Sequence, residues 1–356
     1  MKLNPNQIEK LNKHIKDGYI RFQTNETGDL FIYNYTNQTQ YEQNWDEMTM
    51  MCRGLILDKD YNIVARSFDK FFNYEELVNK GKDIPNLPYE ISDKIDGSMI
   101  IAFYWKMQWC TATRGSFNSD QAKKAESLLF EKYVHNLFKM DPSKSYIFEI
   151  LFPENRIVCD YRDKEELVLL TIIDPETGKD CQDVRNLSFI RPIVYHDCDY
   201  KTIRDKVDGT NAEGYVVKFL NGFRMKIKYA EYCRLHKLMC GINERRIWEL
   251  LSNNESIDYI LENVPDEFYD WVKKVIKDLN DKYKRIELFT NKIFWDISDW
   301  PDSTRKEKAL YIMKYHKEFS SIIFKMMDGH EYRSLIWKLI KPKAEKPFHQ
   351  RNLDAE

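Results

Sequence analysis

The sequence predicts an α+β protein, with an antiparallel-sheet-rich domain over residues 1–240 and an all-helical domain over residues 241–356. Three observations predict this fold. The chain has 356 residues, more than one compact core usually holds. Short segments rich in β-branched and aromatic residues dominate up to about residue 230. After about Tyr229, apolar residues recur every three or four positions, which is typical of helices.

The elements of the first domain follow in order along the chain. Residues 5–17 predict a short helix, and residues 120–138 have the spacing of another. Strand-like segments of four to nine residues, each bounded by turn-forming residues, surround the second helix. They cover residues 29–36, 54–58, 62–68, 99–105, 108–114, 145–152, 156–161 and 166–174.

From residue 230 onward, through the whole second domain, the chain shows helical patterns alone. They cover residues 230–241, 244–253, 256–264, 266–297, 303–316 and 318–327. Basic residues outnumber acidic ones from residue 304 to residue 351, so the last helices could present a basic face. An ordinary solvated helix surface explains the same pattern equally well.

Composition excludes several classes of protein. The net charge of -2 does not by itself indicate a nucleic-acid-binding protein. The seven cysteines are scattered and form no C-x-x-C, which supports neither a zinc site nor a disulfide framework. The N-terminus lacks a signal-peptide core, and the longest apolar run, residues 167–173, is too short for a membrane helix. We therefore expect a soluble cytoplasmic protein with no membrane partner.

One loop carries an unexpected cation. Lys94 stands two residues before Asp96-Gly97-Ser98, between two apolar segments. The turn needs only Asp-Gly, so Lys94 is either an ordinary surface lysine or a group with a chemical role. The glycines form neither G-x-G nor a P-loop, so a nucleotide bound here would be held by cations and backbone groups.

A second cluster of charges lies in residues 213–228. Asn221-Gly222 predicts a hairpin with a two-residue loop, which pairs residue 220 with residue 223. This register puts Phe223, Met225 and Ile227 on the core face. On the other face it puts one carboxylate and three cations: Glu213, Arg224, Lys226 and Lys228. Such a face is either a solvated surface with ordinary salt bridges or a pocket for a polyanion.

Further charges stand alone among apolar neighbours. Glu149 is the charged residue of an otherwise apolar strand, which is costly unless it is paired or lies in a cleft. It is either a structural ion pair or a functional group. Arg53, Lys70 and Arg114 likewise follow or precede apolar segments.

In this order, these segments resemble the covalent nucleotidyltransferase superfamily and, within it, the phage-type RNA ligase 1 family. Residues 94–98 resemble the family's lysine motif, residues 148–150 its third motif, residues 213–216 its fourth and residues 226–228 its fifth. Arg53-Gly54 and residues 70–73 resemble its contacts to the ATP phosphates. The resemblance covers about residues 1–235, and the helical C-terminal third is also similar to this family.

The resemblance implies an ATP-dependent RNA ligase that joins 5′-phosphate and 3′-hydroxyl RNA ends, such as those of a nicked tRNA, in RNA repair. It implies a monomer that acts in the cytoplasm, which is the host cytoplasm for a protein of a phage or virus. The implied catalytic residues are Lys94, Asp96, Lys226 and Lys228. The implied ATP contacts are Arg53, Lys70, Phe72, Ile95, Gly97, Arg114, Glu149, Val216, Lys226 and Lys228. Mg²⁺, or Mn²⁺ in its place, would lie at Asp96 and Glu213.

The same resemblance assigns roles within this set. Lys94 would form a lysyl-AMP, with Lys226 and Lys228 at the α-phosphate. Arg53 and Lys70 would hold the phosphates that leave, and Glu149 a ribose hydroxyl. Arg114 stands where relatives often have lysine. The adenine contacts would be Phe72, Leu169 or Leu170, and Val216.

Two positions stay open on the residues alone. The predicted register turns Val216 away from the Glu213 face, unless a bulge lies near Gly214. Tyr232 resembles a family tyrosine, but core packing is the more common role for a residue of this kind.

Two other functions are compatible with parts of the pattern. A DNA-end ligase or a capping enzyme would share the chemistry, but those enzymes carry an OB-fold after the first domain. A non-catalytic RNA-binding protein could use the same fold, although every charged motif position is occupied here.

Overall fold

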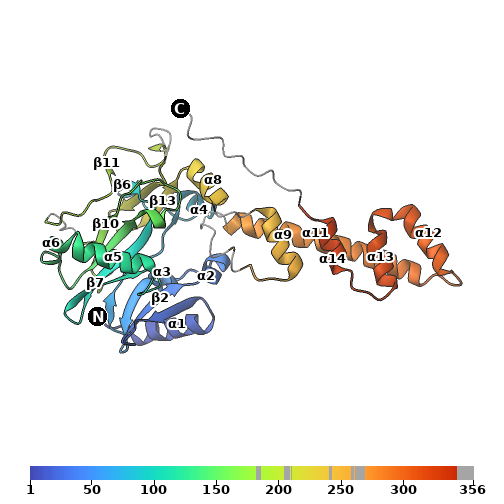
Figure 1. Ribbon diagram of the computed structural model, residues 1–356, viewed down its shortest axis with the longest axis horizontal. Coiled ribbons are helices and arrows are strands. Elements are labelled where there is room, and N and C mark those ends of the chain that lie inside the picture. Colours follow the sequence, from blue (N-terminus) through green and yellow to red (C-terminus); the bar gives the residue numbers. More distant parts are fainter. Residues whose placement is uncertain are drawn as a thin grey trace. The chain divides into compact units, whose positions relative to one another are not determined.

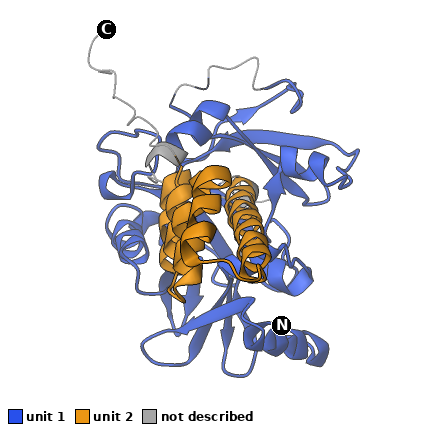
Figure 2. Ribbon diagram, turned by 90° about the vertical axis from the view of Figure 1, so that its right-hand side faces the viewer, with its two compact units in different colours: residues 1–239 blue, residues 240–356 orange. Residues whose placement is uncertain are grey.

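The computed structural model describes residues 1–181, 186–203, 209, 211–239, 243–257, 260 and 269–342. The chain divides into two compact units, Met1–Met239 and Cys240–Glu356 (Figure 2). The strands of the described residues all belong to unit 1, where they form three sheets (Figure 1). The described elements of unit 2 are helices. The predicted α+β class is confirmed.

The first sheet has the order β1-β2-β3-β4. Its antiparallel strands are β1 (Ile20–Thr24), β2 (Leu30–Tyr35), β3 (Arg53–Asp58) and β4 (Ile63–Ala65). Helix α1 (Pro5–Lys16) packs on one face, with Leu11 against Leu55 and Leu57. It begins at Pro5 because Asn4 and Gln7 form a capping box. Two short helices, α2 (Asn37–Glu42) and α3 (Glu47–Met51), connect β2 to β3.

The second sheet packs on the other face of the first. Its order is β10-β9-β7-β8, with β10 (Glu166–Ile173), β9 (Ser145–Leu151), β7 (Ser98–Trp105) and β8 (Gln108–Thr113). Ile101 and Ile147 of this sheet share a core with Ile32 and Ile56 of the first. Helices α5 (Asp120–Glu131) and α6 (Val134–Leu137) follow β8, and α5 packs on the opposite face of the second sheet. A 3₁₀ turn, η1 (Pro153–Asn155), follows β9.

The third sheet carries the predicted hairpin. Its order is β11-β6-β12-β13-β5, and its strands are β11 (Val194–Tyr195), β6 (Tyr89–Lys94), β12 (Gly214–Phe219), β13 (Arg224–Lys228) and β5 (Phe72–Asn73). One face is apolar and packs with α4 (Tyr74–Asn79) and α8 (Ala230–Met239). The other face carries the charged residues of the hairpin.

Unit 2 is built from α9 (Glu244–Asn253), α11 (Tyr269–Ser298), α12 (Arg305–Tyr315), η3 (Lys317–Phe319), α13 (Ser320–Met327) and α14 (Arg333–Leu339). Ile293, Ile297, Ile312 and Ile323 form a small core between α11, α12 and α13. Most of the helix predicted over residues 256–264 lies outside the described residues.

Three local predictions differ from the structure. Residues 156–161 do not form a strand. The backbone N–H groups of Val158 and Cys159 bond the carboxylate of Asp96 instead of a neighbouring strand. The helical pattern over residues 120–138 is interrupted between α5 and α6, and the strands β1, β5, β6 and β11 were not predicted.

The predicted hairpin register is wrong by one residue. Gly214 pairs with Lys228, Val216 with Lys226 and Lys218 with Arg224. The loop has three residues, 220–222, because the N–H of Gly222 bonds the carbonyl of Phe219 and Gly222 has φ +88°. Met225 and Ile227 lie in the core as predicted, but Tyr215 and Val217 are their partners there.

No helix in the described part of the chain is long and apolar enough to cross a membrane. Six of the seven cysteines lie in the described residues, and all six are free thiols.

Gly214 is the position where the third sheet depends on the absence of a side chain. Its φ is +145°, and a Cβ would lie 2.0 Å from the carbonyl oxygen of Ile227. We expect Gly214→Ala to lower the free energy of unfolding by roughly 3 kcal/mol or more, because overpacking adds to backbone strain. Urea unfolding followed by circular dichroism measures this.

The matched control is Gly222→Ala in the same hairpin. Gly222 also has a positive φ, but open space surrounds its Cα. Its cost should be about 1–2 kcal/mol, from the left-handed conformation alone. Equal losses of stability for the two variants would show that close strand approach at Gly214 is unimportant.

Candidate active site

The charged face of the third sheet is built from rows of paired residues. Lys94, Gly214 and Lys228 form one row across β6, β12 and β13. Ser92, Val216 and Lys226 form the next. Paired residues of neighbouring strands project on the same side of a sheet. The loop lysine and the two hairpin lysines, distant in sequence, therefore share one face.

Glu213 joins the ends of this row. Its Oε2 lies 2.7 Å from Nζ of Lys94, and its Oε1 lies 2.8 Å from Nζ of Lys228. Glu213 lies just before Gly214, the first residue of β12. Because Gly214 has an irregular backbone conformation, with φ +145°, the alternation of side chains along β12 does not extend to Glu213. Burial by itself opposes ionisation, but Lys228 and Lys94 outweigh it and lower the pKa of Glu213.

Glu149 approaches the same lysine from the second sheet. A Cβ on Gly97 would lie 2.5 Å from the carbonyl oxygen of Ile150 and 3.1 Å from Cγ of Glu149, so the Lys94 loop packs directly on β9. Burial, reinforced by the Glu213 and Asp96 carboxylates, raises the pKa of Glu149 to about 7. Lys94 and Arg53 only partly offset this rise. Near neutral pH the group can either accept or donate a hydrogen bond.

Asp96 anchors the loop that carries Lys94. It is 3% exposed. Its Oδ2 accepts the N–H groups of Val158 (2.9 Å) and Cys159 (2.8 Å), and its Oδ1 accepts the hydroxyl of Tyr232 (2.6 Å). The N–H of Asp96 donates to the hydroxyl of Tyr161 at 3.0 Å. Both carboxylate oxygens are engaged within the protein, which favours positioning of the loop over direct metal ligation. The predicted metal role of Asp96 stays a prediction.

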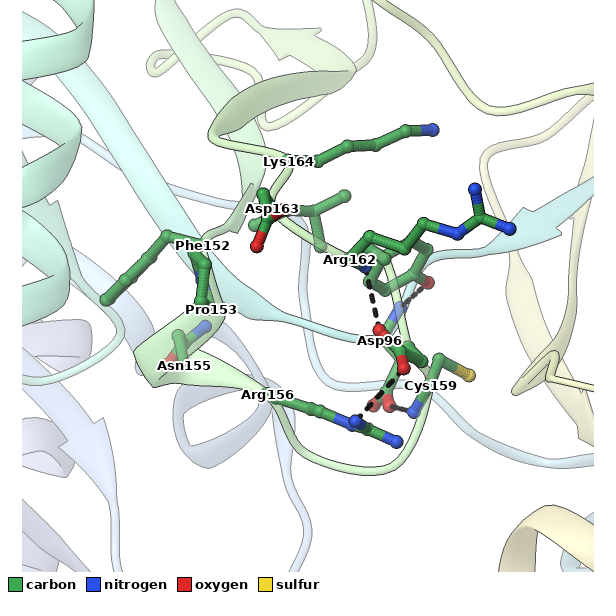
Figure 3. A pocket seen from close by; sticks show the side chains of 12 residues that line it. Asp96, Phe152, Pro153, Asn155, Arg156, Cys159, Arg162, Asp163 and Lys164 are labelled. Carbon is green, nitrogen blue, oxygen red and sulfur yellow. Dashed lines mark hydrogen bonds and ion pairs between the residues drawn. The ribbon is translucent and has the colours of Figure 1, made fainter. Parts of the chain in front are cut away.

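A pocket of about 400 Å³ lies beside this loop (Figure 3). It is lined by Asp96 and by residues 151–153, 155, 156 and 159–164. Figure 3 shows Asp96 and Cys159 joined by a hydrogen bond. Arg156 and Asp160 form an ion pair at 3.1 Å, so part of the lining charge is neutralised locally.

The other predicted cations lie on aromatic rings. The guanidinium of Arg53 stacks on Phe68 at 4.8 Å and donates to Sδ of Met99. Lys70 is 5% exposed, and its Nζ lies 5.4 Å from the ring of Tyr35. Arg114 donates to the hydroxyl of the same tyrosine at 3.0 Å.

Of the four residues predicted to contact adenine, the structure favours Val216 and Leu170 over Leu169 and Phe72. Val216 is half-buried on the face of Lys226, so the corrected register removes the objection to its role. Leu170 is half-buried, whereas Leu169 is buried in the core under α5. Phe72 pairs with Met225 and therefore belongs to the opposite face from Val216, which does not favour adenine contact. Ile95 and Gly97 are half-buried and flank Asp96.

Sequence reasoning missed several aromatic residues around the site. Tyr161 lies in a segment predicted to be a strand, yet its hydroxyl accepts the N–H of Asp96. Tyr232, which the sequence left open, lies in the core and also donates its hydroxyl to Asp96. Tyr35 and Trp45 lie near Lys70. The sequence contains no local signal for these contacts, because each joins segments far apart in the chain.

The raised pKa of Glu149 makes stability depend on pH. The usual pKa of a glutamate is near 4.5, so wild-type stability should fall as pH rises from about 4.5 to about 7, where the buried carboxylate must ionise. Glu149→Gln removes this penalty. It should be more stable than wild type by roughly 1–3 kcal/mol at pH 8, and equal to it below pH 4.5. Urea unfolding across this range measures the difference.

Glu166→Gln is the matched control with the opposite sign. Burial opposes ionisation of Glu166, but Lys132 and Tyr133 outweigh it and lower the pKa of this carboxyl. This variant should therefore be the less stable protein at neutral pH, with the loss disappearing in acid. Parallel pH profiles for wild type and Glu149→Gln would contradict the buried-carboxyl interpretation.

Comparisons with known proteins show the family of this chain. A profile of the RNA ligase family matches residues 51–232, just over half of the chain. A protein of Autographa californica nuclear polyhedrosis virus, named as a bifunctional polynucleotide kinase/RNA ligase, is 29% identical over 71% of this chain. That match covers 39% of the viral protein, so this chain spans well under half of its length.

An RNA ligase of Rhodothermus phage RM378 is 24% identical over 85% of this chain and 86% of its own. Among solved structures, an archaeal ATP-dependent RNA ligase has a TM-score of 0.47 and 10% identity, covering 91% of this chain and 96% of its own. The family profile spans the third sheet, the Lys94 loop and the Glu149 strand described above. The chain belongs to the RNA ligase family.

Proposed function

We propose that this protein is an ATP-dependent RNA ligase that joins 5′-phosphate and 3′-hydroxyl RNA ends through an AMP carried on Lys94. One observation supports this function most: the ammonium groups of Lys94 and Lys228 each contact one oxygen of Glu213, and Glu149 lies nearby. The proposal thus joins three motifs, far apart in sequence, at one candidate nucleophile.

In the first step, the uncharged amine of Lys94 attacks the α-phosphorus of ATP. The new N–P bond forms as the P–O bond to the β-phosphate breaks, and pyrophosphate leaves. The amine must first lose its proton. Lys226, which is 8% exposed, and Lys228 lie on the same face of the sheet as Lys94. They would stabilise the charge that develops on the α-phosphate.

The described residues of the candidate site offer Mg²⁺ few protein ligands. The described residues hold no group of three or more His, Cys, Asp or Glu side chains that could bind a metal by themselves. Both oxygens of Glu213 contact lysines, just as both oxygens of Asp96 accept hydrogen bonds, so direct ligation by either carboxylate would require one of these contacts to break. Mg²⁺ usually keeps several waters and binds substrate phosphates, so phosphates and water would hold it beside Glu213. When bound, Mg²⁺ (or Mn²⁺) would neutralise phosphate charge beside Glu213.

The later steps need RNA. AMP moves from Lys94 to the 5′-phosphate of one RNA end, and a 3′-hydroxyl then displaces AMP and joins the strands. We propose that unit 2 takes part in RNA recognition, possible substrates being nicked tRNAs. In α12, Arg305, Lys306, Lys308 and Lys314 outnumber Glu307, which suits phosphate contacts. Cytoplasmic location and a monomeric state also remain predictions.

Lys94→Ala tests the function directly. Incubation with α-labelled ATP and Mg²⁺ should transfer label to wild type, and the variant should take none, because no other group carries the nucleophile. Intact mass should show one added AMP, mapped to the peptide that contains Lys94. Lys218→Ala, a lysine farther along the charged face, is the control and should label normally.

Label on Lys94→Ala would refute the nucleophile. Wild type that neither takes label nor joins RNA would favour the non-catalytic alternative. Labelling by GTP in preference to ATP would favour a capping enzyme.

Lys226→Ala tests the proposed stabilisation of the α-phosphate. The rate of AMP attachment at saturating ATP should fall about 10²–10³-fold, as for loss of a preorganised transition-state donor. Single-turnover labelling measures this rate, and Lys226→Arg, which keeps the charge, should recover part of it. A wild-type rate in Lys226→Ala would remove this lysine from the reaction.

A further inference from the structure

Asn73 carries a buried amide that the fold itself leaves unused. The residue is 5% exposed, and its Oδ1 has no hydrogen-bond partner among the residues that the structure describes. Asn73 also stands at the N-cap of α4, yet its side chain makes no capping hydrogen bond. Asparagine is favoured at an N-cap because its side chain normally caps the helix. A buried polar group without a partner is uncommon in folded proteins and calls for an explanation such as a ligand.

The register of the third sheet places Asn73 on the face that carries the site lysines. Asn73 of β5 pairs with Lys226 of β13, and paired residues of neighbouring strands project on the same side of a sheet. Phe72, the other residue of β5, pairs with Met225 and packs with the apolar face. Lys226 is 8% exposed. Two buried polar side chains therefore lie side by side at the proposed position of the α-phosphate.

The order of the strands places these lysines between Lys94 and Asn73. Lys94 is the last residue of β6, and Asn73 is the last residue of β5. Strands β12 and β13 lie between them, and β13 carries Lys226 and Lys228. Neighbouring strands are about 4.8 Å apart. An α-phosphate held by Lys226 and Lys228 would thus have Lys94 on one side and Asn73 on the other.

The chemistry gives this opposite side a second occupant. In an in-line phosphoryl transfer, the entering and leaving groups lie on opposite sides of the phosphorus. Lys94 enters during AMP attachment, and pyrophosphate leaves. During AMP transfer, an oxygen of the RNA 5′-phosphate forms a bond to the α-phosphorus as the N–P bond breaks, and the Lys94 amine leaves and takes up a proton. The RNA 5′-phosphate must therefore enter opposite Lys94, where pyrophosphate had been.

We propose that Asn73 binds the 5′-phosphate of the RNA end that receives AMP. The inference rests on the proposed function and assigns the RNA side of the same site. The NH2 group of the amide donates to a phosphate oxygen, since a half-turn of the amide exchanges its oxygen and its nitrogen. The other RNA end reacts through an uncharged 3′-hydroxyl, so a donor beside two lysines suits the 5′-phosphate better.

Two variants of Asn73 test this subsite in protein that is loaded with labelled AMP and freed of ATP. Asn73→Ala should raise the concentration of 5′-phosphate RNA needed for half-maximal AMP transfer about tenfold, as for loss of one hydrogen bond to a charged group. Asn73→Asp, which has nearly the same shape, should raise it further, because a carboxylate repels the phosphate. Single-turnover transfer of the label to RNA measures both effects.

Equilibrium binding without ATP separates the phosphate contact from the rest of the RNA. By fluorescence anisotropy, wild type should bind an RNA oligomer with a 5′-phosphate more tightly than the same oligomer with a 5′-hydroxyl. Pyrophosphate should compete with the first oligomer and not with the second. In Asn73→Ala the preference for the 5′-phosphate should shrink about tenfold.

Asn136→Ala is the matched control. Asn136 is also buried and also has an amide atom without a partner among the described residues. It belongs to α6, and its Oδ1 bonds Ser188, so it takes no part in the third sheet. This variant should keep the wild-type preference for the 5′-phosphate.

Three results would overturn the subsite. One is a wild-type preference for the 5′-phosphate in Asn73→Ala. Another is wild-type AMP transfer by Asn73→Asp, which would show that the amide accepts a hydrogen bond from a hydroxyl. The third is equal weakening of both RNA oligomers, which indicates a loss of general RNA binding. Wild type that takes no AMP from ATP would instead refute the proposed function, and the binding measurement, which needs no ATP, would still decide the subsite.

Discussion

The carboxylate of Glu213, between the ammonium groups of Lys94 and Lys228, is the interaction on which the candidate site depends. Two ammonium groups that contact the same carboxylate repel each other. A buried carboxylate with one oxygen on each cation removes that conflict. Breaking such an arrangement leaves uncompensated buried charge, which is strongly destabilising. The ion pairs therefore hold β6, β12 and β13 in register around Lys94.

Close backbone packing brings the remaining groups to this point. At Gly214 the chain comes so near Ile227 that no side chain fits, and at Gly97 the loop after Lys94 lies directly on β9. These contacts put Glu149 beside Lys94, although the two residues belong to different sheets. Asp96 then fixes the loop through bonds to residues 158, 159, 161 and 232. Loop and strands thus form one rigid support, as electrostatic catalysis requires.

The cations of the candidate site contact two kinds of partner in the protein, namely carboxylates and aromatic rings. Lys94 and Lys228 use a carboxylate, and Arg224 pairs with Asp180. Lys70 and Arg114 lie on aromatic rings, which attract a cation without neutralising it.

Local sequence patterns determined the fold class, most strands, and the identity of the charged motif residues. Apolar periodicity and the lone charges of Lys94, Glu149 and the hairpin are properties of short segments, and short segments suffice to reveal them. The register did not follow from such signals. Asn221-Gly222 predicted a two-residue loop, yet three residues form it, whereas Lys106-Met107, with no glycine, makes a true two-residue turn with positive φ at both positions.

Only the tertiary structure decided which groups meet. Val216 lies on the lysine face because the pairing of β12 with β6 and β13 fixes the register, and a shift of one residue would turn every side chain over. The segment 156–161 has the composition of a strand but bonds a distant carboxylate instead. The rings around Lys70 come from segments with no pattern in common. Contacts of this kind depend on packing between remote parts of the chain, which local periodicity does not encode.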